Sequence, residues 1–252
     1  MVSTTSGRPD PEPKQTSWGR FLYWSGRFHE SPEFDANERN YKLKVAAHLD
    51  DARTAVFEDD PLWLDTLHYA ITAKPNNLTS WRATQAFVAW CRAEPEAGKL
   101  ALRMLWNEDY AVAKRFDQFA EVVATSGRNI PISEASFFHM VMDPYAFPMF
   151  RATPVDRAMT LTNYPEPREV GIKSGELGRR YEHFLRFLDV IIKRGSKVGL
   201  DLRDRLDAQS AMWMVTQWLP LDEWSEGDKE AFLAYQGGAA LRKDSWMTPK
   251  TS

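Results

Sequence analysis

Residues 202–213 read LRDRLDAQSAMW, the most informative stretch of the chain. The pattern predicts the opening of a helix that is apolar on nearly every side. Four polar residues lie within that apolar surface: Arg205, Asp207, Gln209 and Ser210. A buried polar group destabilises the fold unless it finds a partner. We therefore expect this helix to carry either a specific internal network or a site.

Helical spacing extends outward from this stretch over most of the chain. Apolar residues recur at helical intervals from about residue 38, and no alternation of period two persists. The expected helices cover residues 39–58, 61–73, 80–93, 96–107, 111–124 and 179–194, with others around Phe137 and Phe138, after Pro154 and from Ser225 to Tyr235. Residues 165–178 hold proline and glycine without periodicity, which favours a long loop.

Capping residues indicate where several of these helices begin. Ser133 is the expected cap of the helix around residues 137–141. Thr153 is followed by a proline and then by Asp156, which predicts a cap, a first helical proline and an acid in the first turn. Ser225 stands three residues before an acid and is a further expected cap. Asp201 is a candidate cap for the helix that follows it.

The N-terminal residues divide into two parts. Residues 1–16 contain Ser, Thr, Pro and charged residues with nothing to bury, and we expect a disordered tail. Residues 17–34 hold aromatic side chains between glycines and arginines, which favours an irregular or short extended aromatic arm. The aromatic residues are Trp18, Phe21, Tyr23, Trp24, Phe28 and Phe34. Such an arm either stacks on bases, with Arg20 and Arg27 meeting phosphates, or packs over the helices.

The expected fold is an all-α, multi-helix single domain over residues 17–238, with a flexible tail at 239–252. The chain has 252 residues, 43% of them hydrophobic, which supports a real core. The net charge is −3, so any contact with nucleic acid needs a local basic patch. The chain has one cysteine, no apolar run near the roughly 20 residues that a membrane span needs, and no apolar leader segment. These features indicate a cytoplasmic protein with no membrane contact.

Sequence motifs for catalysis are absent. The chain has no GxxxxGK[ST] motif, no GxGxxG after a strand and no HExxH, and its histidines never pair at i,i+4. Cys91 lies on the apolar face of its expected helix, where a thiol is inert. Glu58, Asp59 and Asp60 stand at a helix end before Pro61, which favours a solvated turn. The sequence therefore favours a protein that is not an enzyme, with no metal and no cofactor.

A stiff aromatic loop at residues 143–151 is the first candidate binding element. Its two prolines restrict the backbone, and Arg151 ends it. Such a loop suits a pocket that stacks a flipped base, and it equally suits a structural corner between helices. Tyr145, Phe147 and Phe150 are the candidate base-stacking residues.

The most basic window of the chain runs from residue 193 to residue 205. Lys193, Arg194, Lys197, Arg203 and Arg205 stand there against Asp201 and Asp204, a local charge of +3. A patch of this kind would contact phosphates, and salt would weaken the contact. The alternatives are a solvated connection between helices and, for Arg205 and Asp207, internal partners that lock helices together. The candidate phosphate contacts are Arg151, Lys193, Arg194, Lys197 and Arg203.

Several short segments together resemble a known family. They are residues 77–82, 85–87, 136–138, 143–144, 147–151, 153–154, 181–185 and 206–210. In their order they resemble the helical N-terminal region of bacterial AAA+ restriction proteins of the McrB type, over about residues 40–220. In that family a variable N-terminal domain recognises DNA, often with a modified cytosine, and a nucleotide-hydrolysing motor works with a separate nuclease subunit. The motor's phosphate-binding motif is missing here, so the resemblance implies an isolated recognition region or a stand-alone relative and transfers no catalytic residue.

The expected function is a non-catalytic DNA-recognition module of a bacterial antiphage or restriction system, with DNA, an AAA+ motor and a nuclease subunit as partners. Modified cytosine is the expected DNA feature. The first alternative is a helical protein-interaction scaffold or oligomerisation domain in a defence complex, which suits the net negative charge. The second is an enzyme with a helical glycosylase-like fold, which would need a catalytic Asp or Lys beside a pocket.

Overall fold

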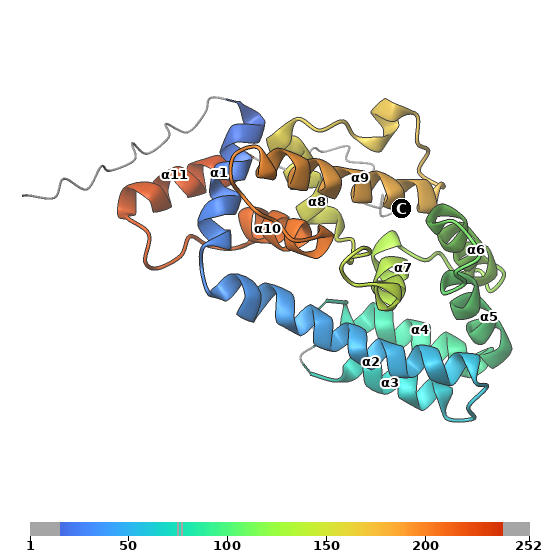
Figure 1. The fold of residues 1–252 in the computed structure, drawn as a ribbon. Helices are drawn as coiled ribbons and strands as arrows, with labels where there is room; N and C mark the ends of the chain where they lie inside the picture. The colour runs from blue at the N-terminus through green and yellow to red at the C-terminus, as the bar shows by residue number, and fades with distance from the viewer. Residues whose placement is uncertain (1–15, 75, 77, 239–252) are drawn as a thin grey trace, which may run out of the picture.

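The computed structural model describes residues 16–74, 76 and 78–238, which form eleven α-helices without a β-strand in that part of the chain (Figure 1). The α-helices are α1 Ser17–His29, α2 Asn40–Phe57, α3 Trp63–Thr72, α4 Trp81–Ala93, α5 Pro95–Leu105, α6 Val112–Ala124, α7 Ile132–His139, α8 Ala152–Thr162, α9 Leu177–Ser196, α10 Arg205–Gln217 and α11 Glu226–Gly237. A π-helix, η1 Phe34–Arg39, and two 3-10 helices, η2 Met140–Met142 and η3 Pro167–Val170, join them. The expected all-α, multi-helix fold is confirmed.

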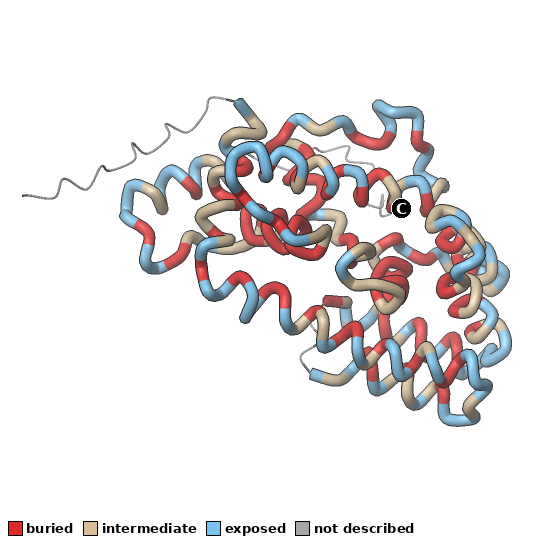
Figure 2. The backbone as a smooth tube through the Cα atoms, viewed as in Figure 1, coloured by how far each residue is buried: buried red, intermediate tan, exposed pale blue. Residues whose placement is uncertain are grey.

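Helix α10 occupies the centre of one group of helices. It contacts α1, α8 and α9, and Figure 2 shows it almost entirely buried. Residues 206–212 are buried without interruption, as expected for a helix that is apolar on nearly every side. The helix begins at Arg205 because the Asp204 side chain accepts a hydrogen bond from the Asp207 N–H, at 2.9 Å. Asp204, and not Asp201, is therefore the cap.

Residues 17–29 form α1, so the irregular aromatic arm expected there was wrong. Phe21, Trp24 and Phe28 recur at helical spacing, and the side chain of Thr16 caps the helix by accepting from the Gly19 N–H at 3.1 Å. Each glycine destabilises a helix by roughly 1 kcal/mol relative to alanine, and the packing of this aromatic face outweighs that loss. All three aromatic rings are at most 5% exposed, so the face packs over the helices and is not free to stack bases.

The two expected tails fall almost wholly outside the described residues. These begin at Thr16, which caps α1, and end at Gly238. Within them one buried hydrophobic cluster includes side chains from Phe21 in α1 to Phe232 in α11.

A second group of helices packs beside the first. Helix α2 lies along α3, α4 contacts both α3 and α5, and α5 lies along α6 (Figure 1). Helix α6 also packs on α9, and η1, which leads into α2, contacts α10, so both contacts help to connect the groups. The connection at residues 165–178 is mostly irregular, as expected, although it includes η3 and α9 begins within it at Leu177.

Two of the three expected caps do not act as caps. Ser225 accepts from the Asp228 N–H at 3.1 Å and confirms its prediction. Helix α7 instead begins after Pro131 and α8 after Arg151, because both residues already have the extended backbone of a cap position. Ser133 and Thr153 are thus the second residues of their helices, and neither helix start has a side-chain cap.

Candidate functional site

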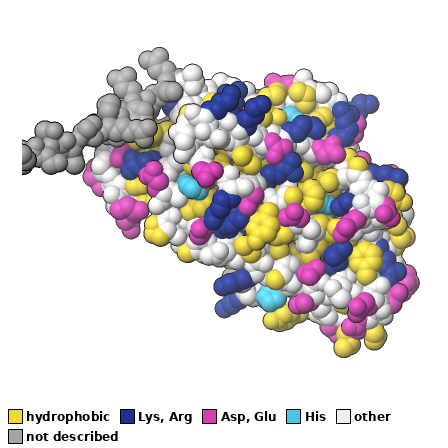
Figure 3. Space-filling model, viewed as in Figure 1, with side chains coloured by type: hydrophobic (Ala, Val, Ile, Leu, Met, Phe, Trp, Pro, Cys, Tyr) yellow, Lys and Arg dark blue, Asp and Glu magenta, His cyan; other side chains and the backbone are white. Residues whose placement is uncertain are grey.

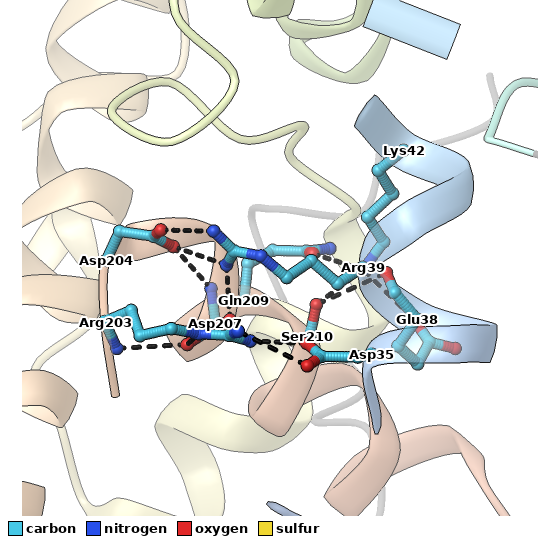
Figure 4. A network of polar contacts seen from close by, with 9 residues as sticks. All are labelled: Asp35, Glu38, Arg39, Lys42, Arg203, Asp204, Asp207, Gln209 and Ser210. Carbon is cyan, nitrogen blue, oxygen red and sulfur yellow. Dashed lines mark hydrogen bonds and ion pairs between the residues drawn. The ribbon is translucent and has the colours of Figure 1, made fainter. Parts of the chain in front are cut away.

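Polar side chains from η1 and α10 meet in a buried network, shown in Figure 4. Arg39 donates to both carboxylate oxygens of Asp204, at 2.9 and 2.6 Å, and to Asp207. Asp207 also accepts from the backbone N–H and the guanidinium of Arg203, at 3.0 and 2.6 Å. Asp207 is fully buried and Arg39 is 7% exposed. Each buried charge therefore has an opposite charge beside it, as burial requires.

Lys42, at the start of α2, is the second centre of this network. Its Nζ donates to Gln209 Oε1 at 2.7 Å and to Ser210 Oγ at 3.0 Å, and it lies 3.0 Å from Glu38 Oε2. Burial lowers the pKa of Lys42, and the Glu38 carboxylate opposes that shift. Trp218 Nε1 donates to the other oxygen of Glu38 at 2.9 Å. The polar residues of α10 thus find internal partners, which favours the internal network over a site.

Arg205 is also held internally, at the start of α10. Its guanidinium donates to both carboxylate oxygens of Asp189 on α9, at 2.7 and 2.8 Å, and to the Ala146 carbonyl at 3.1 Å. The predicted locking of helices through Arg205 and Asp207 is confirmed by these contacts.

A shallow pocket of about 330 Å³ lies at the edge of the network, between the residues after α1 and those before α10. Its cation is Arg203, which is paired with both Asp35 and Asp207. These two carboxylates raise the pKa of Arg203 further above its usual value. An incoming anion would have to displace a carboxylate from Arg203, so the predicted phosphate contact at this residue is weakened.

The loop at residues 143–151 is a folded corner between η2 and α8. Asp143 Oδ1 accepts from the backbone N–H groups of Tyr145 and Ala146, at 2.9 and 3.1 Å. The backbone N–H of Phe150 donates to Ser136 Oγ at 2.9 Å. These bonds support the alternative of a structural corner.

The three aromatic residues of this loop differ in exposure. Phe150 is fully buried with its ring 5.3 Å from that of Phe184, so the structure does not present it to a base, contrary to the expectation. Phe147 is half-buried. Tyr145 is 45% exposed, and the Arg39 guanidinium lies 5.1 Å from its ring centroid. Tyr145 alone among the three predicted stacking residues keeps an exposed ring.

Three of the predicted phosphate contacts gather at the C-terminal end of α9. Lys193, Arg194 and Lys197 are exposed there, and none has a carboxylate partner within the described part of the chain. The guanidinium of Arg194 lies 4.6 Å from the ring centroid of Trp18. The structure thus brings these three cations together and leaves them accessible.

The fifth predicted contact, Arg151, lies elsewhere. It stands before α8, donates to the Leu78 carbonyl and lies 5.4 Å from the ring centroid of Trp213. Burial lowers the pKa of Arg151, and no carboxylate among the described residues forms an ion pair with it. Arg151 lines a pocket of about 390 Å³ formed by the first turns of α4, α7 and α8.

The same pocket contains Glu134, in the first turn of α7. Glu134 is 5% exposed, and its Oε1 has no hydrogen-bond partner among the described residues. Burial raises the pKa of Glu134 to about 7, while the charge of Arg128 opposes the shift. Sequence reasoning missed this pocket because its walls come from four separated segments. The available signals were Arg151, which was predicted as a phosphate contact at the end of the loop, and the hydroxyls of Ser133 and Thr153, which were interpreted as two caps.

Potential metal ligands and the single cysteine are the other candidates for chemistry. No group of three or more His, Cys, Asp or Glu side chains in the described ranges is placed to hold a metal ion. Cys91 is fully buried and burial raises its pKa to about 12, so it is an inert thiol, as its helical position predicted. Among the described helices, none combines the length and apolar character that a membrane crossing needs.

Protein-family models, curated proteins and solved structures were compared with the chain, and none matches it.

Proposed function

We propose that the exposed end of α9 binds the phosphate backbone of a nucleic acid and that the protein is a non-catalytic recognition module. The observation that carries the proposal is the grouping of Lys193, Arg194 and Lys197, all exposed and without a carboxylate partner in the described residues. A paired cation such as Arg203 must give up its partner before it binds phosphate. The three cations of α9 meet no such competition.

The contact has to be local. Figure 3 shows Lys and Arg side chains interspersed with Asp and Glu on the face that it presents, and the net charge of the chain is −3. The C-terminal end of a helix favours cations by about 0.3–1 kcal/mol, which by itself would place basic residues there. The helix effect alone does not predict any binding to DNA. Nucleic-acid binding predicts an affinity that falls steeply as the salt concentration rises.

The proposed ligand is DNA, and cytosine modification is the feature to test. The resemblance of the separate segments to McrB-type restriction proteins supports this choice. In such a role the protein would work in the cytoplasm of a bacterium, in antiphage defence, with an AAA+ motor and a nuclease subunit as partners. Tyr145, with its exposed ring, is the candidate base contact, and Phe147 is a weaker one.

Fluorescence anisotropy with labelled duplex and single-stranded DNA, with and without modified cytosine, tests the proposal at several salt concentrations. The wild-type protein is compared with the double variant Lys193→Glu and Lys197→Glu. Each lost phosphate contact lowers the slope of log affinity against log salt by about 0.9, so the double variant should lose nearly two. Lys44→Glu, at an exposed lysine of α2, is the matched control and should change neither slope nor affinity beyond twofold.

Absence of DNA binding at low salt, or equal slopes for the double variant and the wild type, would reject this function. The second candidate is then a protein-interaction scaffold. It is favoured by Leu62 and Tyr69, which are 62% and 60% exposed; Leu62 is the cap residue before α3, and Tyr69 lies seven positions later within that helix. Large exposed apolar side chains on one helical face are typical of a contact surface. Sedimentation velocity over a range of protein concentrations would test self-association through that face.

A further inference from the structure

We propose that the pocket formed by the first turns of α4, α7 and α8 binds the phosphate group of a small phosphate monoester. This inference goes beyond nucleic-acid recognition at α9 and does not depend on it. The pocket has a volume of about 390 Å³, and Ser80, Ser133, Arg151 and Thr153 are among the residues that line it.

The Arg151 guanidinium is the first argument for an anion. A guanidinium carries five N–H donors, and within the described residues Arg151 donates to the Leu78 carbonyl alone. The Trp213 ring lies 5.4 Å from it, and burial lowers its pKa. A partly buried charge without a counter-ion destabilises the fold. An anion bound in the pocket would supply the missing counter-ion, and a guanidinium matches phosphate with two parallel hydrogen bonds.

Three helix starts are the second argument. Helices α4, α7 and α8 have 13, 8 and 11 residues, and none has a side-chain cap at its first turn. The first N–H groups of a helix have no partner inside the helix, and the helix dipole places partial positive charge there. The hydroxyls of Ser133 and Thr153, each the second residue of its helix, make no hydrogen bond within the described residues. Backbone N–H groups and hydroxyls together are the donors that phosphate uses.

Glu134 is the third and independent argument. Its side chain is 5% exposed and lines the pocket, and its Oε1 has no hydrogen-bond partner in the part of the chain that the structure describes. Its pKa is raised to about 7, so a large share of the molecules hold this carboxyl protonated at neutral pH. A protonated carboxyl donates a hydrogen bond that an anion oxygen accepts. The charged group that acts on Glu134 is Arg128, which favours the ionised form, while Arg151 lines the same pocket.

The size and walls of the pocket indicate an ester and not the bare ion. A water molecule occupies about 30 Å³ in the liquid, so the pocket has room for many more heavy atoms than a phosphate has. Met149, Pro154 and Trp213 provide apolar surface beside the donors. We therefore place the phosphate at the helix starts and an apolar or aromatic organic group against Trp213.

Isothermal titration calorimetry with inorganic phosphate, a nucleoside 5′-monophosphate and the matching nucleoside tests the inference. We expect phosphate to bind with a dissociation constant near 1 mM or below, the monophosphate to bind at least tenfold more tightly, and the nucleoside to bind far more weakly than either. Arg151→Met should weaken binding of the monophosphate at least tenfold. The matched control is Arg157→Met, since Arg157 is a half-buried arginine of α8 that also donates to a backbone carbonyl, and this variant should bind normally.

Thr153→Asp is a second variant that tests the site without removing a packed side chain. Residue 153 is exposed in the first turn of α8, where an acid favours the helix, so the variant should fold and melt at or above the wild-type temperature. Its carboxylate would occupy the anion position, and phosphate binding should be lost. No heat with phosphate or monophosphate, or binding that persists in both variants, would overturn the inference. Fluorescence anisotropy with labelled DNA is measured on the same two variants, so that failure of this inference can be distinguished from failure of the proposal for α9.

Discussion

Arg39 donates a hydrogen bond to Asp207, 168 positions later in the chain. The bond joins η1 to α10, and the Asp207 carboxylate is fully buried. Because removal of one partner leaves a buried charge uncompensated, this pair ties together two distant segments of the sequence. The central position of α10 among α1, α8 and α9 makes that connection important for the whole fold.

Asp207→Ala should lower the free energy of unfolding by about 3 kcal/mol, because Arg39 and Arg203 lose a buried counter-charge. Urea denaturation at neutral pH measures this change. The double variant Arg39→Met with Asp207→Leu should be more stable than the summed effects of Arg39→Met and Asp207→Leu, each measured alone, predict. In the double variant neither member of the pair is left as a charge without the other. Asp201→Ala, at an exposed acid that does not cap α10, is the control and should fall within about 0.5 kcal/mol of the wild type. If the changes in unfolding free energy of the two single variants add up to that of the double variant, the pair is not coupled.

The core of this fold could be predicted from the sequence because helical periodicity is a local property. The run around Leu206 predicted a helix that is apolar on nearly every side, with either an internal network or a site for its polar groups. The helix is buried, and the polar groups have internal partners. The partners themselves could not be predicted. Arg39 and Lys42 lie more than 160 positions away, and nothing local in an expected amphipathic helix distinguishes them from solvated cations.

The wrong expectations for residues 17–29 and for two of the helix caps each have a physical reason. Gly19 and Gly26 lower the intrinsic helix propensity of residues 17–29, and tertiary packing of the aromatic face outweighs it. Ser133 and Thr153 are good caps by residue type, but the chain enters each helix earlier, at backbone conformations that no propensity encodes. The exposed cations at the end of α9 were predictable from charge alone. The pocket around Arg151 was not, because it depends on three helix starts that only the tertiary fold brings together.

His139 should make the protein sensitive to acid. It is fully buried against aromatic rings, and burial lowers its pKa from 6.5 to about 3. The folded state therefore excludes a proton that the unfolded state takes up below pH 6.5, so stability is lost as the pH falls from 6.5 towards 3. Each pH unit in this window corresponds to about 1.4 kcal/mol. Chemical denaturation at pH 6.5 and 4.5 should show the loss in the wild type, and His139→Phe should lose roughly 2–3 kcal/mol less over that interval.

Glu134 should make stability depend on pH in the opposite direction, over nearly the same pH range. Its pKa is about 4.5 in the unfolded chain and about 7 in the fold. The stability that this proton provides is fully present below pH 4.5 and is lost as the pH rises through 7, to a total of roughly 3 kcal/mol. Glu134→Gln should therefore become more stable relative to the wild type as the pH is raised from 5 to 8. Parallel stability curves for variant and wild type over that range would contradict the raised pKa.

Helices α6 and α9 approach each other closely at Gly178. A Cβ on Gly178, at the start of α9, would lie 2.0 Å from the carbonyl oxygen of Ala113 in α6. Neither atom belongs to a flexible side chain, so Gly178→Ala must move one helix away from the other, which should destabilise the protein by about 2–3 kcal/mol. Gly227→Ala is the matched control in α11, where a Cβ meets no atom within 4 Å. That change should stabilise the protein by about 0.4–1 kcal/mol, since alanine restricts the unfolded chain. Equal melting temperatures for the two variants would show that α6 and α9 do not approach each other as closely as this structure places them.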